Sequence, residues 1–292
     1  MRSADKLAIA FLVAFSALVL LALLVRGHTI AVLQPQGLVA KAELTLMINA
    51  ILLMLIVALP MLSMAFFFAW WYRADNERAM YSPNWEHGIM TELVWWVIPL
   101  EIVLVLGAVT WTSTHTLDPH KALAVQDSPL KIQVVALNWK WLFIYPEQHI
   151  ATINYIEFPV RRPVEFDITA DAPMNSFWIP QLGGQMYAMT GMVTQLNLVA
   201  DTLGIFVGSS ANYSGDGFAK MKFTASAVSE SDFNDWVQSV KMSSTTLDSD
   251  AYERLEKPNV ANPPSSYASV PDNFFSTIVA KFMPAAMQDM MH

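Results

Sequence analysis

The chain has 292 residues, a formal net charge of −8, and 14 % charged against 54 % hydrophobic residues. A soluble domain typically carries about 25 % charged residues, so the composition excludes an ordinary soluble protein. Because there is no cysteine, a disulfide framework, a cysteine nucleophile, a cysteine zinc site and a lipidated cysteine are all excluded. The acidic balance, without any lysine or arginine block, argues against nucleic-acid binding.

Three apolar runs occupy the first part of the chain. Residues 7–25 and 44–72 contain no charged side chain, and residues 93–111 contain only Glu101. About 20 predominantly apolar residues span a bilayer as a helix, because a helix pairs its backbone polar groups internally. Each run is long enough to span, and Pro60 is placed to kink the second.

The first run has two interpretations. Arg2 and Lys6 precede it, as in a signal peptide, but no small-residue cleavage site follows it. We therefore predict that residues 1–28 form a hydrophobic helix or an uncleaved signal anchor.

The positive charges predict the orientation of the chain in the membrane. Arg2 and Lys6 put the N-terminus inside, and Arg73 and Arg78 put the loop after the second run inside. Residues 42–112 are then a transmembrane helical hairpin, and the rest of the chain lies outside the cytoplasm.

From about residue 113 the pattern predicts a globular all-β domain. Short apolar and β-branched runs, separated by Pro, Gly or Asp, favour a sandwich or barrel over residues 113–228. Those runs are KIQVVAL, ATINYIEF, VEFDITA, NSFWIP, TQLNLVA, GIFVG and MKFTASAV.

Residues 229–292 change period and are predicted to be a helical extension with a tail. Residues 231–241, 248–257 and 271–282 are the helix candidates, and residues 262–266 form a predicted linker.

Several candidate metal sites have simpler interpretations. His115, Asp118 and His120 follow the third run and supply a two-histidine, one-carboxylate set, but a hydrated turn is the simpler interpretation. The methionine-rich tail supplies soft sulfur ligands that suit Cu(I), but a flexible tail without a function is the simpler interpretation. The tail residues concerned are Met283, Met287, Met290, Met291 and His292.

Two carboxylates lie within or beside the third run. Glu101 is near its middle, where a charge costs about 2.5–3.5 kcal/mol, so we expect it to be uncharged or to face a partner helix. Glu92 lies at its inner end, either as a solvated helix terminus or as a proton-collecting group.

Trp139 and Trp141, in the motif NWKW, are two positions apart. On a strand they would face the same side, either packed in the core or contacting a partner protein. From the residues alone, an oxidase subunit, a receptor and an assembly factor all remain possible.

Several long motifs, in order, resemble subunit II of the haem-copper oxidases, and among them the quinol oxidase branch of the bacterial bo type. They are YSPNWEH (81–87), ELVWWVIP (92–99), LNWKWLFIYPEQHIAT (137–152), MNSFWIPQLGGQMYAMTGM (174–192) and YSGDGFAKMKF (213–223). The resemblance implies membrane helices that carry a cupredoxin-like β-barrel outside the membrane, with short C-terminal helices.

The resemblance also identifies a lost copper site. The cytochrome c oxidases of this family bind two copper ions through two cysteines, two histidines, a methionine and a carbonyl. Aligned on Met221, the only retained side-chain ligand, this chain has other residues at the remaining positions. They are Asn175 and Phe218 for the histidines, Ser210 and Ser214 for the cysteines, and Asn212 for a glutamate. Hydroxyls are poor copper ligands and a phenyl ring is none, so we predict no metal in this subunit.

The family then implies a function. The chain would be a non-catalytic subunit II of a proton-pumping ubiquinol oxidase in a bacterial inner membrane, with its C-terminal domain in the periplasm. Haems and copper would belong to subunit I. The partners of this chain would be subunit I, smaller membrane subunits, membrane lipid and ubiquinol. Glu92 matches the position of a proton-channel entrance in the family. The alternative is a membrane-anchored periplasmic binding or assembly protein with a degenerate cupredoxin domain.

Overall fold

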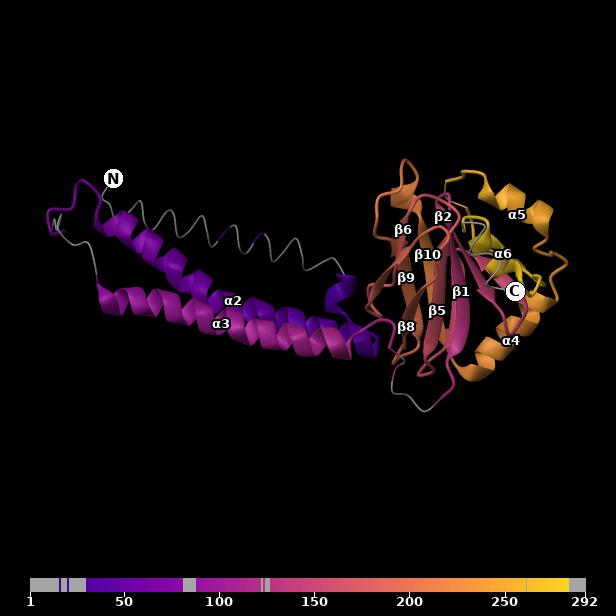
Figure 1. The fold of residues 1–292 in the computed structure, drawn as a ribbon, viewed down its shortest axis with the longest axis horizontal. Coiled ribbons are helices and arrows are strands. Elements are labelled where there is room, and N and C mark those ends of the chain that lie inside the picture. Colours follow the sequence, from indigo (N-terminus) through magenta and orange to yellow (C-terminus); the bar gives the residue numbers. More distant parts are fainter. Residues whose placement is uncertain are drawn as a thin grey trace. The chain divides into compact units, whose positions relative to one another are not determined.

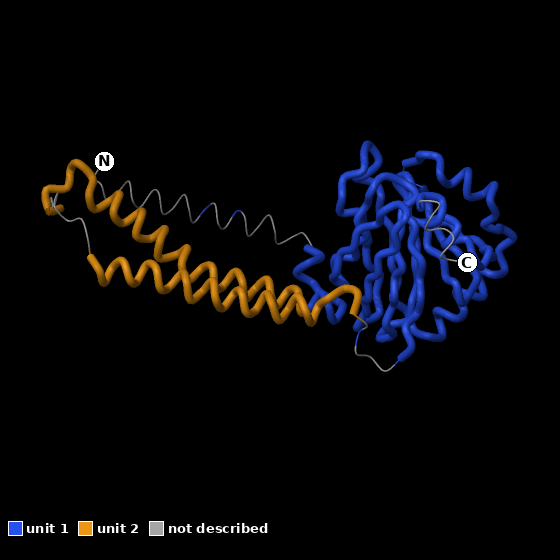
Figure 2. Tube along the Cα trace, viewed as in Figure 1, with its two compact units in different colours: residues 1–41, 123–292 blue, residues 42–122 orange. Residues whose placement is uncertain are grey.

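The computed structural model describes residues 16, 20, 30–80, 88–121, 123, 127–260 and 262–283. Within it the chain divides into two units, residues 42–122 and residues 1–41 with 123–292 (Figure 2). The predicted helix over residues 1–28 lies outside the described residues, apart from two isolated positions. The same is true of the methionine-rich tail beyond Met283.

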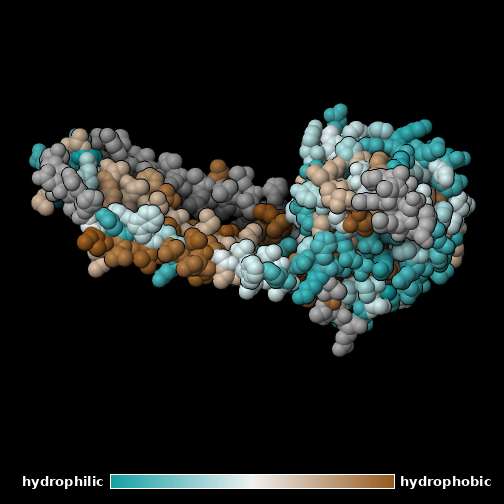
Figure 3. All heavy atoms as spheres, viewed as in Figure 1, coloured by the Kyte–Doolittle hydropathy of each residue, from teal (hydrophilic) through white to brown (hydrophobic). Residues whose placement is uncertain are grey.

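Two long helices form the predicted hairpin, α2 (Leu38–Trp71) and α3 (Ile89–Thr116). With 34 and 28 residues, both exceed the roughly 20 that cross a bilayer, and both are apolar enough to do so. Most of their side chains are exposed, and Figure 3 shows hydrophobic residues gathered over them. A surface of this kind is stable in lipid rather than in water.

The two helices lie together over only part of their length. In one half, Leu46 and Leu53 of α2 and Leu106 and Val109 of α3 line a shared pocket of about 300 Å³. Beyond Pro60, residues 61–70 of α2 are all exposed, and Figure 1 shows α2 diverging from α3 there. A proline inside a helix removes one backbone hydrogen bond and bends the axis, which accounts for the divergence.

The second unit is a β-sandwich of two sheets (Figure 1). One sheet has the order β11-β3-β2-β1-β5-β8 and the other β4-β10-β9-β6-β7. The strands are β1 (Leu130–Leu137), β2 (Lys140–Tyr145), β3 (Ile150–Ile153), β4 (Tyr155–Pro159), β5 (Val164–Ala170), β6 (Asn175–Trp178), β7 (Gln185–Ala188), β8 (Thr194–Leu198), β9 (Gly204–Ser210), β10 (Lys222–Val228) and β11 (Ser265–Tyr267). The predicted all-β domain is thus confirmed, and each of the seven predicted runs contains a strand.

Two details of the prediction were wrong. The run ATINYIEF is two strands, because Asn154 takes a left-handed conformation (φ 54°) between β3 and β4. An asparagine adopts that conformation more readily than most residues. The predicted linker at 262–266 includes the start of β11, which pairs antiparallel with β3, so part of it belongs to the sheet.

The six-stranded sheet is buried on both faces. One face packs inside the sandwich, around Phe143, Phe166 and Phe177 among other side chains. The opposite face, including Leu142 and Ile144, packs against the C-terminal helices. This double burial explains why β2 is buried along its whole length instead of alternating with solvent.

The C-terminal extension consists of the helices α4 (Glu230–Lys241), α5 (Ser249–Glu256) and α6 (Phe274–Ala280). α4 begins where the Ser229 hydroxyl accepts the backbone N–H of Asp232 at 3.1 Å, which is an N-cap. All three helices belong to the same unit as the sandwich. The predicted boundary at 228/229 therefore marks a change of secondary structure within one unit.

A buried polar cluster joins this extension to the sandwich. The Tyr252 hydroxyl of α5 donates to the Asp171 carboxylate at 2.8 Å, and Lys281 contacts the same carboxylate at 3.0 Å. Asp171 is buried, and burial together with this carboxylate raises the pKa of Tyr252. Tyr252 therefore stays protonated and remains a donor at physiological pH.

We expect Tyr252→Phe to lower the free energy of unfolding of the outer domain by about 1.5 kcal/mol, because the buried carboxylate loses one donor. Thermal unfolding of the full chain, followed by circular dichroism, measures the change. Tyr213→Phe, at a tyrosine that is 73 % exposed, is the matched control. Equal midpoints for the two variants would contradict the role assigned to the cluster.

Candidate functional site

The predicted copper-ligand positions Asn175 and Ser210 lie side by side in the sandwich. Strand β6 pairs antiparallel with β9, with Phe177 opposite Ser210. The Ser210 hydroxyl donates to the Asn175 side-chain oxygen at 3.0 Å, and the two residues are 7 % and 1 % exposed. The fold thus brings the first residue of β6 and the last residue of β9 together, and a neutral hydrogen bond joins their side chains.

The retained methionine is next to this pair. Met221 follows the short helix η2 (Phe218–Lys220), and its carbonyl accepts the backbone N–H of Ser210 at 3.2 Å. Its side chain is buried in the core of the sandwich. Phe218, at the second histidine position, packs its ring against Tyr213 with centroids 5.7 Å apart.

The loop between β9 and η2 contains the other two positions. The Asn212 amide donates to the Met174 carbonyl at 3.0 Å. The Ser214 carbonyl accepts the indole N–H of Trp139 at 3.1 Å, while the Ser214 hydroxyl is buried without a hydrogen-bond partner among the described residues. The loop is therefore fixed by contacts within the protein.

These donors do not fit copper. The positions offer hydroxyl, amide and phenyl groups, and a serine hydroxyl is protonated at neutral pH, whereas copper sites of this kind require soft thiolate and imidazole ligands. Among these positions in the described part of the chain, Ser214 has a buried hydroxyl without a partner, and that hydroxyl supplies no negative charge. The described residues contain no group of three His, Cys, Asp or Glu side chains placed to hold a metal. His115, in the last turn of α3, instead has its Nδ1 2.8 Å from the Trp111 carbonyl.

The tryptophan pair differs from the prediction. Trp139 lies in the turn between β1 and β2 with φ 61°, and only Trp141 is on a strand. Trp141 is 0 % exposed and contacts Phe177 and Phe223. The interpretation of Trp141 as a partner contact was wrong, because its side chain is enclosed by the core. Trp139 is half-buried, and its role in a partner contact stays a prediction.

This loop requires a glycine that was not among the predicted site residues. A side chain on Gly217 would lie 2.3 Å from the Trp139 ring, so the indole fits only above a residue without Cβ. Gly215, with φ 106°, adopts a conformation that favours glycine. The two glycines in YSGDGF are the pattern from which a close backbone approach could have been predicted.

The two membrane carboxylates lie on opposite sides of α3. Glu92 is in the first turn, where a negative charge is favoured by the helix dipole, and it is half-buried together with Pro99, Ile102 and Leu106. Glu101 is exposed. Nine positions at 3.6 residues per turn separate the two by about 180° around the helix and about 13.5 Å along it. The two carboxylates therefore lie on opposite faces of α3, in different surroundings.

Two family profiles match this chain. One, described as cytochrome c oxidase subunit II, periplasmic domain, covers residues 145–228 and so includes all the copper-ligand positions discussed above. The other, the COX aromatic rich motif, covers residues 241–285. That segment contains α5 and α6, where Tyr252 and Phe274 form an edge-to-face ring contact.

Curated relatives extend the similarity along most of the chain. The cytochrome bo(3) ubiquinol oxidase subunit 2 of Pseudomonas aeruginosa is 49 % identical over 89 % of this chain and 79 % of its own length. The ubiquinol oxidase subunit 2 of Acetobacter aceti is 47 % identical over 92 % of this chain and 88 % of its own. The periplasmic domain of cytochrome oxidase subunit II from Bradyrhizobium japonicum aligns with a TM-score of 0.38 at 21 % identity, covering 39 % of this chain and 95 % of that domain. The chain belongs to the family of subunit II of the bo-type ubiquinol oxidases.

Proposed function

We propose that this chain is a non-catalytic subunit II of a proton-pumping terminal ubiquinol oxidase, which oxidises quinol and reduces oxygen to water. The single observation that supports this most directly is the replacement of the copper ligands by a neutral set, with Ser210 hydrogen-bonded to Asn175. A copper relay is needed when electrons arrive from a water-soluble cytochrome. Quinol dissolves in the bilayer and can reach a haem-bearing subunit directly.

The placement of cofactors and partners follows from this proposal. The haems and copper of the complex belong to subunit I, which α2 and α3 hold together with smaller membrane subunits. The outer domain lies in the periplasm and covers the outer face of subunit I. Support comes from two helices able to span a bacterial inner membrane and from the match to a periplasmic-domain family.

The test of this function is purification of the assembled protein in mild detergent, with oxygen uptake measured for two electron donors. We expect haem-containing partners to copurify and uptake to be driven by ubiquinol, with reduced cytochrome c giving little. A haem-free protein that purifies alone would contradict the proposal and favour a membrane-anchored periplasmic binding or assembly protein with a degenerate cupredoxin domain.

We also propose that Glu92 collects protons at the cytoplasmic mouth of a channel that continues in subunit I. Its place in the first turn of α3 puts it at the start of a membrane span, and the arginines at positions 73 and 78, which precede this span in the sequence, mark the cytoplasmic side. A carboxylate at a membrane edge can accept protons from water and pass them to a neighbouring group.

Glu101 is proposed to contact a transmembrane helix of another subunit. An exposed carboxyl group in mid-membrane is costly, and a hydrogen-bond donor on a neighbouring helix offsets that cost. Because Glu101 faces away from Glu92, this helix is on the side of α3 opposite the proposed proton entrance.

Glu101→Leu is therefore expected to reduce copurification of this chain with the haem subunit about fivefold, the factor that corresponds to about 1 kcal/mol for a hydrogen bond between helices in lipid. Glu101→Gln keeps a hydrogen-bonding group and should assemble nearly as the wild type does. Val105→Leu, one turn further along the same face, is the control. Assembly of the Glu101→Leu variant at the wild-type level would show that the carboxyl group has no partner.

A further inference from the structure

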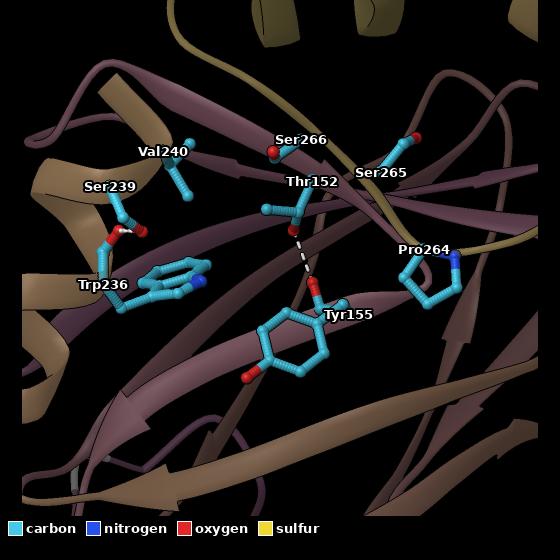
Figure 4. A pocket seen from close by; sticks show the side chains of 8 residues that line it. All are labelled: Thr152, Tyr155, Trp236, Ser239, Val240, Pro264, Ser265 and Ser266. Atoms are coloured by element: carbon cyan, nitrogen blue, oxygen red, sulfur yellow. Dashed lines mark hydrogen bonds between the residues drawn. The ribbon is translucent and has the colours of Figure 1, made fainter. Parts of the chain in front are cut away.

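A cavity of about 240 Å³ lies in the outer domain between α4 and the edge where β3, β4 and β11 meet. None of its lining residues is a copper-ligand position, and the proposed function makes no use of it. Its lining comes from three parts of the chain, as Figure 4 shows. The lining residues are Thr152, Tyr155, Trp236, Ser239, Val240, Pro264, Ser265 and Ser266.

Aromatic and proline rings form the walls of this cavity. Trp236 and Tyr155 have ring centroids 6.0 Å apart and planes tilted by 56°, and in Figure 4 Pro264 lies on the side away from Trp236. Trp236 is held from behind by Tyr145 at 5.5 Å and Phe233 at 5.8 Å. The Trp236 ring is thus fixed in place before any ligand binds, and a preorganised wall lowers the cost of binding.

The cavity also offers hydrogen-bonding groups that the protein leaves available. The indole N–H of Trp236 has no hydrogen-bond partner among the described residues, and in Figure 4 this edge of the ring is directed toward Thr152 and Tyr155. Ser266 contributes a hydroxyl, which both donates and accepts, whereas in Figure 4 the Ser265 hydroxyl is directed away from Trp236. The Thr152 hydroxyl is already used, since it donates to the Tyr155 carbonyl.

None of the lining residues is charged at physiological pH. They include no Asp, Glu, Lys or Arg, and burial, with the hydrogen bond to Glu157, raises the pKa of Tyr155 to about 12. The Tyr155 hydroxyl is bonded to the Glu157 carboxylate. An anion would find no counter-charge here, and a cation would find only that carboxylate, which Tyr155 already occupies.

We infer that this cavity binds a neutral sugar ring. The C–H faces of a sugar pack against the negative face of an aromatic ring, and its hydroxyls match the indole N–H of Trp236 and the hydroxyl of Ser266. A purely apolar ring would leave both of these groups unpaired, at a free-energy cost. The sugar is either a free saccharide or the headgroup of a glycolipid, since both present the same ring.

The experiment uses the full chain in a zwitterionic detergent, because detergents with sugar headgroups would compete. Saturation-transfer NMR with methyl β-D-glucopyranoside tests the free sugar, and nanodiscs with or without a monoglucosyl diacylglycerol test the lipid. We expect saturation of the sugar ring protons from at least one source, and Trp236→Phe to weaken binding about fivefold through loss of one hydrogen bond. Trp178→Phe, at a half-buried tryptophan outside the cavity, should leave binding unchanged.

Ser266→Ala provides a second variant in case the first unfolds, and it should weaken binding about threefold. Binding from neither source would overturn the inference, as would equal binding by the wild type and both cavity variants. Binding of a hexaproline peptide that depends on Trp236, without binding of sugar, would overturn it too, because the cavity would then recognise a peptide.

Discussion

Replacing Glu92 with glutamine is expected to lower ubiquinol-driven oxygen uptake by the assembled complex about tenfold, equivalent to about 1.4 kcal/mol on a rate-limiting proton transfer. Glutamine keeps the size and the hydrogen-bonding capacity of the side chain at the first turn of α3, but it cannot bind and release a proton. The fall should therefore appear in turnover and in proton uptake, with assembly and haem content unchanged.

Glu77→Gln is the matched control for this experiment. Glu77 is an exposed carboxylate in the loop that precedes α3, and the arginines of that loop predict the same side of the membrane. Its removal changes the charge without removing the proposed proton-collecting group. Unchanged turnover in the Glu92→Gln complex, or an equal loss in both variants, would exclude a specific role for Glu92 as an entrance.

Phe177→Ala is expected to destabilise the outer domain by about 3–5 kcal/mol, because it opens a cavity among aromatic rings. Phe177 is 0 % exposed. Its ring stacks on Phe223 at 5.1 Å and an interplanar angle of 9°, and it also contacts Phe166 and Trp141. The position lies on β6 two residues from Asn175, so its loss also loosens the replaced copper site.

The expected fall in the unfolding midpoint is about 10 °C for a domain of this size, measured on the full chain by near-ultraviolet circular dichroism. Leu203→Ala is the control, since Leu203 is 63 % exposed and should change stability by less than about 0.5 kcal/mol. A shift no larger for Phe177→Ala than for Leu203→Ala would mean that the rings do not form a tightly packed core.

The sequence predicted those elements whose own pattern determines them. Both long helices of the hairpin follow from long apolar runs, the second interrupted only by Glu101, and β5 (Val164–Ala170) matches the predicted run VEFDITA residue for residue. Alternating and β-branched patterns predict a strand with one buried face. Such patterns are reliable where only one face of the strand is covered by other parts of the protein.

The missed elements depend on distant parts of the chain. β2 (Lys140–Tyr145) is buried throughout because the C-terminal helices cover its second face, so after Lys140 it lacks the alternation of apolar and polar residues that marks a strand. β11 (Ser265–Tyr267) has almost no apolar residue and forms through backbone pairing with β3. Neither contact can be read from the local sequence.

The candidate site was predictable only in part, for the same reason. Spacing along the chain assigned Ser210, Asn212 and Ser214 to three successive copper-site positions, and in the structure Ser210 ends β9 while the other two lie in the loop after it. The pairing of β6 with β9, which brings Asn175 to Ser210, joins segments that are distant in sequence. Trp139 was wrongly placed on a strand together with Trp141, because it lies in the two-residue turn before β2, in a left-handed conformation. Because the turn interrupts the strand, the two tryptophans do not follow the two-residue alternation that would place them on the same face of a sheet.

The central claim is that the outer domain has exchanged its copper ligands for a neutral set. The most direct measurement is the copper content of the purified full chain, without its partner subunits, after incubation with copper in detergent and dialysis. The hydroxyl of Ser210 and the amide of Asn175 predict copper far below one ion per chain. One or more tightly held copper ions per chain would contradict the account.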